Sequence, residues 1–156
     1  MQWQPSASLD TLLQRARLLG ATRDFFRQRG LLEVETPALV AHAVSDPHLD
    51  NIPVQLADGR KLWLHTSPEY HMKRLLAAGA PDIWQLGKVF RDGEAGRRHE
   101  PEFTLIEWYR HDCTLRTLAA ESCELIAALA RIAGRSLAAP VYLDYRELFL
   151  AVLDID

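Results

Sequence analysis

The chain has 156 residues, of which 48% are hydrophobic and 25% are charged. This composition is typical of a globular domain with a buried core, and it excludes a disordered chain. The formal net charge of -3 gives no overall attraction to nucleic acid or to an anionic membrane, although Arg97, Arg98 and His99 form a local basic cluster. Cys113 and Cys123 fit neither a disulfide framework nor a zinc site, and we see no signal peptide and no apolar run of membrane-spanning length. We therefore expect a cytoplasmic protein with no membrane partner.

The first expected element is a helix over about residues 9 to 29, where apolar residues recur at helical spacing. Ser8 can cap its start and Gly30 can end it. The stretch "LLEVETP" then predicts a short strand that ends at Pro37, because proline has no amide donor for a strand ladder. We expect residues 38 to 50 to form a loop.

A hairpin and a second helix are expected next. The segments "IPVQL" and "KLWLHT" are separated by turn residues from Ala57 to Gly59, which is typical of a hairpin. The following run, "SPEYHMKRLLAAG", predicts a helix with Ser67 as the N-cap, Pro68 as the first helical residue and Gly79 as the stop.

The rest of the chain completes a mixed pattern of helices and strands. "IWQLGKVF" predicts a strand up to Arg91, and "EFTLIEWYR" predicts a second strand after a charged loop. A helix from Leu115 to Ala133, a strand near "APVYL" and a short helix from Tyr145 follow. The expected fold class is α+β, with mostly antiparallel strand pairing.

The strand "EFTLIEWYR" places chemically different side chains on one face. Because side chains alternate along a strand, Phe103, Glu107 and Tyr109 share a face with Leu105. A partly buried carboxylate needs a cation or several hydrogen-bond donors. Two interpretations stay open. The face is either a solvated surface with an incidental acid, or a pocket floor with a ring for stacking, a carboxylate for an ammonium group and a phenol for a hydrogen bond.

Arg91 ends the preceding strand, so its guanidinium group is expected near the same sheet. Guanidinium groups match pairs of phosphate or carboxylate oxygens and stay charged at any working pH. The charged loop after Arg91 is longer than a simple hairpin requires, and such loops are often functional. The alternative is a surface hairpin with salt bridges that contribute little.

These segments resemble the sequence motifs of class II aminoacyl-tRNA synthetases. "FFRQRGLLEVETPAL", within about residues 25 to 39, resembles motif 1, and "FRDGEAGRRHEPEFTLIEWYR", within about residues 85 to 110, resembles motif 2. Within that class the chain is most similar to the catalytic domain of lysyl-tRNA synthetases and to their paralogues, the lysyltransferases that act on elongation factor P. The stretches "WQPSAS", "TSPEYHMKRLL" and "HEPEFTLIEWYR" favour the paralogues, and the likeness covers essentially the whole chain.

The resemblance implies a role for particular residues. Arg91 corresponds to the arginine that holds the α-phosphate of ATP and the amino-acid carboxylate, and Phe103 to the ring that stacks on adenine. The implied ATP-binding residues are Arg91, Asp92, Gly93, His99, Glu100 and Phe103. Those implied to bind lysine or β-lysine are Ser67, Pro68, Glu69, Glu107 and Tyr109. Motif 1 implies a homodimer with Pro37 at the interface.

Two positions depart from the family pattern. Gly93 stands where a glutamate usually meets the adenine amino group, with Glu94 next to it. Glu100 replaces the asparagine that usually follows the loop histidine, and an ionised glutamate donates no hydrogen bond. The usual contacts to ATP are therefore altered at both positions.

The resemblance also implies what lies outside the chain. We expect the 156 residues to be the N-terminal half of a synthetase-like catalytic domain, without an anticodon-binding domain and truncated before motif 3. Magnesium would accompany ATP, with ligands beyond Asp156 and no metal site within the chain, because the histidines lack a metal-ligand spacing. On this expectation the chain alone is inactive.

The implied function is ATP-dependent activation of lysine or β-lysine as the adenylate, followed by transfer to a lysine side chain of elongation factor P. The sequence leaves lysine and β-lysine equally open. A first alternative is a lysyl-tRNA synthetase fragment that charges tRNA, although the missing anticodon-binding domain makes tRNA an unlikely partner. A second is a catalytically inactive module for dimerisation or binding.

Overall fold

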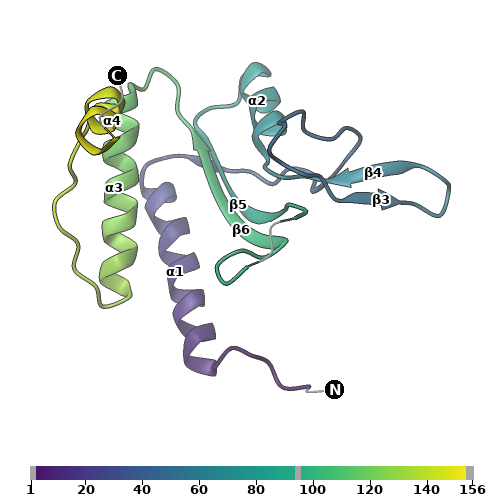
Figure 1. Ribbon diagram of the computed structural model, residues 1–156, viewed down its shortest axis with the longest axis horizontal. Helices are drawn as coiled ribbons and strands as arrows, with labels where there is room; N and C mark the ends of the chain where they lie inside the picture. Colours follow the sequence, from purple (N-terminus) through teal and green to yellow (C-terminus); the bar gives the residue numbers. More distant parts are fainter. Residues whose placement is uncertain (1–2, 94–95, 154–156) are drawn as a thin grey trace. The chain divides into compact units, whose positions relative to one another are not determined.

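The computed structural model describes residues 3 to 93 and 96 to 153 (Figure 1). The chain divides into two compact units. The first unit contains the residues up to Thr22 together with those from Thr114 onward, and the second unit is Arg23–Cys113. The motifs singled out in the sequence lie almost entirely in the second unit.

Helix α1 is Leu9–Gln28, as the sequence predicted. Its start is capped by Ser8, whose Oγ accepts a hydrogen bond of 3.2 Å from the backbone N–H of Thr11. Its end is set by Gly30, which has φ of 75° and donates its amide to the carbonyl of Arg27 at 3.1 Å. A glycine reaches this left-handed conformation without a steric cost, which explains the stop at this residue.

The first sheet has the order β1-β5-β6 and carries most of the residues of interest. β1 (Leu32–Glu33) pairs in parallel with β5 (Ile83–Phe90), and β5 pairs antiparallel with β6 (Glu102–Tyr109). β5 and β6 confirm the two predicted strands. β1 is shorter than "LLEVETP" suggested, because the amide of Thr36 bonds to the side-chain Oε1 of Gln85 at 3.0 Å instead of to a backbone carbonyl of β5.

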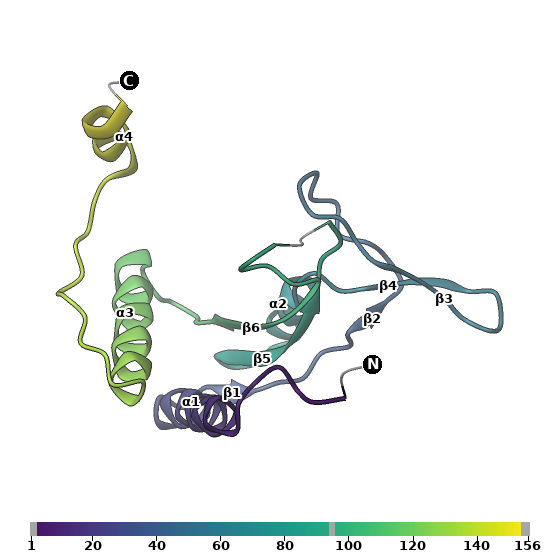
Figure 2. The same ribbon diagram turned by 60° about the horizontal axis from the view of Figure 1, so that its bottom comes forward.

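The second sheet has the order β2-β4-β3 and is antiparallel throughout. β3 (Pro53–Gln55) and β4 (Lys61–Leu64) form the predicted hairpin, which projects away from β5 and β6 in both Figure 1 and Figure 2. β2 (Leu39–Val40) lies within residues 38 to 50, so the prediction of a loop there was wrong at these two positions. Two residues are too few to produce a strand pattern in the sequence.

Helix α2 is Glu69–Ala77 and belongs to the second unit. Its N-cap is Pro68, so the prediction that Ser67 is the cap and Pro68 the first helical residue was displaced by one position. Ser67 still contributes to the start, because its Oγ accepts a 3.0 Å hydrogen bond from the amide of Glu69. Gly79, with φ of 91°, follows the C-cap residue as predicted.

The core of the second unit forms around two aromatic rings. Phe26 and Trp84 are fully buried and stack with their centroids 4.8 Å apart. The ring of Trp108 lies 5.3 Å from that of Phe26. Trp108 therefore faces the core from β6, which agrees with the alternation that assigns Glu107 and Tyr109 to the opposite face.

The first unit holds the remaining helices. α3 is Leu115–Ile132, and its N-cap Thr114 accepts a 3.2 Å hydrogen bond from the amide of Thr117. α4 is Tyr145–Leu153, as predicted. The strand predicted near "APVYL" is absent from the described chain: residues 139 to 143 are exposed and unpaired, and Pro140 offers no amide to a ladder. Within the described ranges, no helix is long and apolar enough to cross a membrane.

Candidate functional site

Glu107 is the centre of a hydrogen-bonded cluster in the second unit. Its Oε2 accepts a 2.8 Å hydrogen bond from the hydroxyl of Ser67, and its Oε1 accepts one of 2.6 Å from the hydroxyl of Tyr109. All three side chains are half-buried. β6 supplies Glu107 and Tyr109 two residues apart on one face, while the turn before α2 supplies Ser67. We name these three residues the carboxylate cluster.

The start of α2 adds a second carboxylate beside the carboxylate cluster. Glu69 is joined to it through its backbone amide, which donates to the Ser67 hydroxyl. The side chain of Glu69 pairs with Lys73 one turn later, with 2.5 Å between Oε1 and Nζ. The hydrogen bond to Glu69 and its charge raise the pKa of Lys73, and the charge of Glu107 adds to the effect. The carboxylates of Glu69 and Glu107 thus both favour the charged form of Lys73.

Tyr109 is held as a hydrogen-bond donor. Burial raises the pKa of its hydroxyl far above the ordinary value of 10.0, and the hydrogen bond to Glu107 and the negative charge of that carboxylate raise it further. The phenol therefore stays protonated at any working pH. Each carboxylate oxygen of Glu107 can accept more than one hydrogen bond, so capacity for a further donor remains. No lysine or arginine forms an ion pair with Glu107 within the residues that the structure describes.

Arg91 and Phe103 form a second group on the same hairpin. The guanidinium carbon of Arg91 lies 5.1 Å from the centroid of the Phe103 ring, which is within the range of a cation–π contact. The Nε of Arg91 donates to the carbonyl of Thr66 at 3.4 Å. Thr66 directly precedes Ser67, so the backbone joins this group to the carboxylate cluster. A planar cation beside an aromatic face fits a nucleotide phosphate and base.

The other loop residues implied by motif 2 lie at the surface. Asp92, Gly93, His99 and Glu100 are all exposed. The amide of Asp92 donates to the carbonyl of Asp50 at 2.9 Å, which joins the charged loop to the segment before β3. Glu94, which the sequence placed beside the missing family glutamate, lies outside the described residues.

The backbone explains one of the departures from the family pattern. Gly93 has φ of 72°, in the region that favours glycine over residues with a side chain. A glutamate at this position would be strained in the observed loop. The sequence departure and the loop conformation are therefore consistent with each other.

Pro37, the residue implied at a dimer interface, is exposed. The two strands on either side of it each expose a leucine, with Leu32 51% and Leu39 38% accessible. Apolar side chains at such positions are available for contact with another protein surface.

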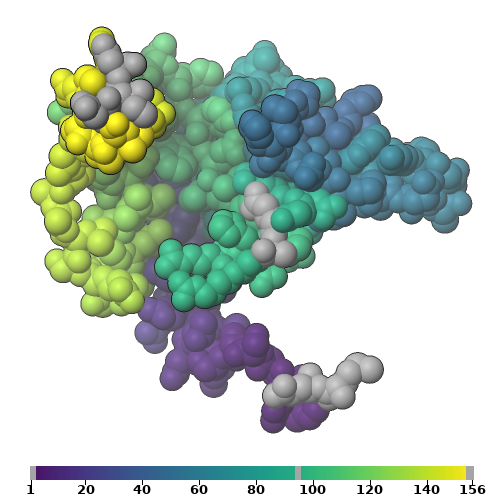
Figure 3. Space-filling model, viewed as in Figure 1, coloured from purple at the N-terminus to yellow at the C-terminus, as the bar shows by residue number. Residues whose placement is uncertain are grey.

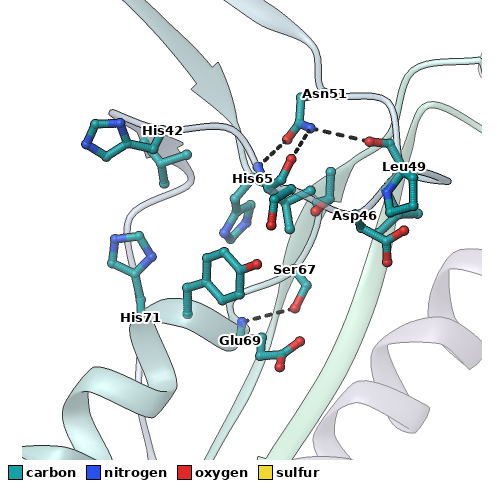
Figure 4. Close-up of a pocket in the computed structure, with 14 residues that line it drawn as sticks. His42, Asp46, Leu49, Asn51, His65, Ser67, Glu69 and His71 are labelled. Carbon is teal, nitrogen blue, oxygen red and sulfur yellow. Dashed lines mark hydrogen bonds between the residues drawn. The ribbon is translucent and has the colours of Figure 1, made fainter.

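A pocket lies beside the carboxylate cluster, and we name it the loop pocket. It has a volume of about 360 Å³ and is lined by residues between 40 and 51 and between 65 and 71, including Ser67 and Glu69. Figure 4 shows His42 and His71 at one end and Asp46 and Leu49 at the other. In Figure 3 the segment of residues 41 to 51 (dark blue) lies at the surface beside α2.

Sequence reasoning missed two members of this region. Lys73 stands four residues after Glu69, a spacing that predicts an ion pair on a helix and was a usable signal. His65 gave no signal, because its burial depends on contacts far away in the chain. Across the described ranges, no group of three His, Cys, Asp or Glu side chains could hold a metal ion.

The antiparallel hairpin of β5 and β6, with an arginine at one end and a carboxylate at the other, corresponds to the motif 2 resemblance in the sequence. The chain belongs to the class II tRNA synthetases: the family described as "tRNA synthetases class II (D, K and N)" matches residues 1–141. This confirms the family to which the sequence motifs pointed.

Curated relatives make the similarity more specific. The chain is 46% identical to "Elongation factor P--(R)-beta-lysine ligase" of Photorhabdus laumondii over 159 aligned positions, which cover 99% of this chain and 47% of that protein. It is 52% identical to the protein of the same name from Pasteurella multocida, over 80% of this chain and 40% of the relative. The counterpart in Yersinia enterocolitica is 46% identical, over 99% of this chain and 47% of its own length. The chain thus spans less than half the length of these relatives.

Proposed function

We propose that the complete protein containing this chain activates lysine or β-lysine with ATP and transfers it to a lysine side chain of elongation factor P. The names of the relatives, which are ligases for (R)-β-lysine and elongation factor P, support this assignment. The main structural support for this proposal is Glu107. Its half-buried carboxylate is oriented by two hydroxyl donors and can still accept further hydrogen bonds.

The carboxylate cluster suits the side-chain ammonium group of the substrate. Glu107 supplies the negative charge, and its hydrogen bonds to Ser67 and Tyr109 fix the direction of its oxygens. Glu69 follows Ser67 at the start of α2, and its carboxylate, which pairs with Lys73 in the structure, is the proposed partner of the substrate's second amino group. A carboxylate for each ammonium group favours a diamino acid over a neutral one, because a half-buried charge that loses its partner is destabilised.

Arg91 and Phe103 suit ATP. In the activation step, a carboxylate oxygen of the amino acid bonds to the α-phosphorus, the bond from that phosphorus to the bridging oxygen breaks, and pyrophosphate leaves. Arg91 would stabilise the negative charge that gathers on the phosphorus oxygens. Magnesium would supply further charge neutralisation when bound with ATP, and we assign it no ligand among the described residues.

The proposed function leads to proposals for the location of the protein and for its oligomeric state. An elongation factor as acceptor places the reaction in the cytoplasm. We also propose a homodimer that uses the region from Leu31 to Pro37, with exposed Leu32 at its centre. No anticodon-binding role is assigned to this chain.

The test compares two isosteric substitutions on β6. Glu107→Gln removes the charge of the carboxylate cluster, whereas Glu102→Gln changes an exposed carboxylate on the opposite face that pairs with Lys88 at 2.6 Å. The assay is lysine-dependent exchange of pyrophosphate into ATP, measured on the complete reading frame with lysine and with β-lysine. A charge-assisted contact of about 1.5 to 3 kcal/mol predicts a rise in the KM for the amino acid of roughly 10- to 150-fold for Glu107→Gln.

The KM for ATP should change far less, and Glu102→Gln should behave like the parent. An unchanged amino-acid KM in Glu107→Gln would remove the proposed role of the carboxylate cluster. Transfer of the activated amino acid to tRNA in place of elongation factor P would identify the alternative, a lysyl-tRNA synthetase activity.

A further inference from the structure

The loop pocket shares two residues with the proposed amino-acid site, but most of its wall is separate from that site. Ser67 and Glu69 belong to both. The remaining lining comes from the end of β2 and the segment before β3, from His65 and Thr66 after β4, and from the first turn of α2. The pocket therefore opens beside the carboxylate cluster and offers space that the amino acid's own contacts do not account for.

The segment that forms the outer wall is held in place by Asn51. Its Oδ1 accepts a 3.1 Å hydrogen bond from the amide of Val44, and its Nδ2 donates to the carbonyl of Val44 at 3.2 Å and to that of Leu49 at 3.4 Å. Figure 4 shows these bonds above the pocket. One side chain thus closes residues 44 to 51 into a fixed turn, so the wall exists before any ligand binds.

His65 contributes a buried nitrogen without a partner. The residue is only 4% exposed, and its Nε2 lies 2.8 Å from the carbonyl oxygen of Lys88. Because a carbonyl oxygen only accepts hydrogen bonds, Nε2 must carry the hydrogen, and in the neutral ring Nδ1 has a free lone pair. This Nδ1 has no hydrogen-bond partner in the structure. Buried polar atoms nearly always have one, so a ligand donor is a natural partner for it.

The backbone on both sides of His65 is fixed as well. Its amide donates to the carbonyl of Ala38 at 2.8 Å, and its carbonyl accepts from the amide of Phe90 at 3.0 Å. The main chain of His65 is therefore held at two points, and its ring is held by the bond from Nε2 to the Lys88 carbonyl. Preorganised acceptors of this kind are suited to proton transfer.

The composition of the loop pocket fits an amine on an aliphatic stem. Val44 and Leu49 provide apolar surface, and Asp46 provides negative charge, while the Glu69 carboxylate at the edge of the pocket already pairs with Lys73. No lysine or arginine is among the described residues that line it. Burial, followed by the charge of Arg74, lowers the pKa of His71, which favours the uncharged form of this histidine.

We propose that the loop pocket receives the acceptor amine, a lysine side chain of the acceptor protein, and that Nδ1 of His65 accepts its proton. This inference rests on the proposed function. The acceptor ammonium gives one proton to Nδ1, and the amine lone pair then forms a bond to the carbonyl carbon of the adenylate. The bond from that carbon to the phosphate oxygen breaks, AMP leaves with the electron pair, and the second amine proton passes to solvent.

The test separates activation from transfer. His65→Gln keeps an N–H that can donate to the Lys88 carbonyl but removes the Nδ1 lone pair, and His48→Gln is the control because His48 is exposed and outside the pocket lining. For each variant of the complete protein, we measure pyrophosphate exchange and the transfer of labelled amino acid to elongation factor P. Loss of a general base predicts that the ratio of transfer to exchange falls on the order of 100-fold in His65→Gln and stays unchanged in His48→Gln.

A small neutral nucleophile provides an independent measurement. Hydroxylamine is unprotonated at neutral pH and needs no base, so hydroxamate formation from the adenylate should follow exchange in His65→Gln. Leu49→Trp fills the pocket and should raise the KM for elongation factor P more than the KM for the amino acid.

Each failure has a separate meaning. A ratio of transfer to exchange that stays the same in His65→Gln, including the case in which both activities fall equally, would overturn the role of Nδ1. An unchanged acceptor KM in Leu49→Trp would overturn the location of the acceptor. Absence of exchange in the parent protein would instead refute the proposed function itself.

Discussion

The hydroxyl of Tyr109 gives the most direct measure of how the carboxylate cluster works. It donates to Glu107 over 2.6 Å, a length typical of a hydrogen bond to an ionised carboxylate. Such bonds contribute about 1.5 to 3 kcal/mol, and the lower end applies because the site is only half-buried. Tyr109→Phe removes this donor and keeps the ring. We expect the carboxylate of Glu107 to lose its fixed direction, which weakens its contact with the substrate ammonium group.

A loss of about 1.5 kcal/mol corresponds to a rise of roughly 10-fold in the KM for the amino acid. The assay is pyrophosphate exchange on the complete protein at varied lysine and fixed saturating ATP. Tyr145→Phe removes the hydroxyl of a tyrosine that is 73% exposed, and it should leave both KM values unchanged. The reasoning is refuted if Tyr109→Phe has the amino-acid KM of the parent, or if it raises the KM for ATP as strongly as that for lysine.

Gln85→Leu leaves the buried amide of Thr36 without its acceptor, so we expect a loss of about 1 to 3 kcal/mol in the free energy of unfolding, measured by urea denaturation. A loss below 0.5 kcal/mol, roughly the scatter of surface substitutions, would contradict it. Burial raises the pKa of Asp82, but the amide of His111 and the guanidinium of Arg110 outweigh it and hold the value below 3.8. Asp82 therefore stabilises the fold above that pH and loses the contribution as pH falls below it, so the stability difference between the parent and Asp82→Asn should shrink on acidification. Leu32→Lys should convert the proposed homodimer to a monomer in light scattering, and a parent that is monomeric at high concentration would refute the interface.

The elements that the sequence predicted well are those defined by local patterns. α1 and α2 are bounded by capping residues and by Gly30 and Gly79, which act within one turn of the helix end. β5 and β6 are eight residues each, long enough to show alternation. The faces of β6 followed from that alternation, and the contact of Trp108 with the core confirms them.

The features that were missed depend on distant partners. β2 consists of two residues that are strand only because β4 lies beside them. The apolar segment "APVYL" has a strand-like composition but finds no neighbouring strand in the described chain. The bond between Ser67 and Glu107 joins residues 40 positions apart, so neither residue predicts the other from its own surroundings.

The backbone hydrogen bond from Asp92 to Asp50 connects the charged loop after β5 with the segment that walls the loop pocket. Because Asn51 holds the turn of residues 44 to 51 through its side chain, Asp50 offers the charged loop a fixed attachment point at Asp92. A substitution that loosens this turn would therefore also loosen the loop that we propose to bind ATP, although the two segments lie about 40 residues apart in the sequence.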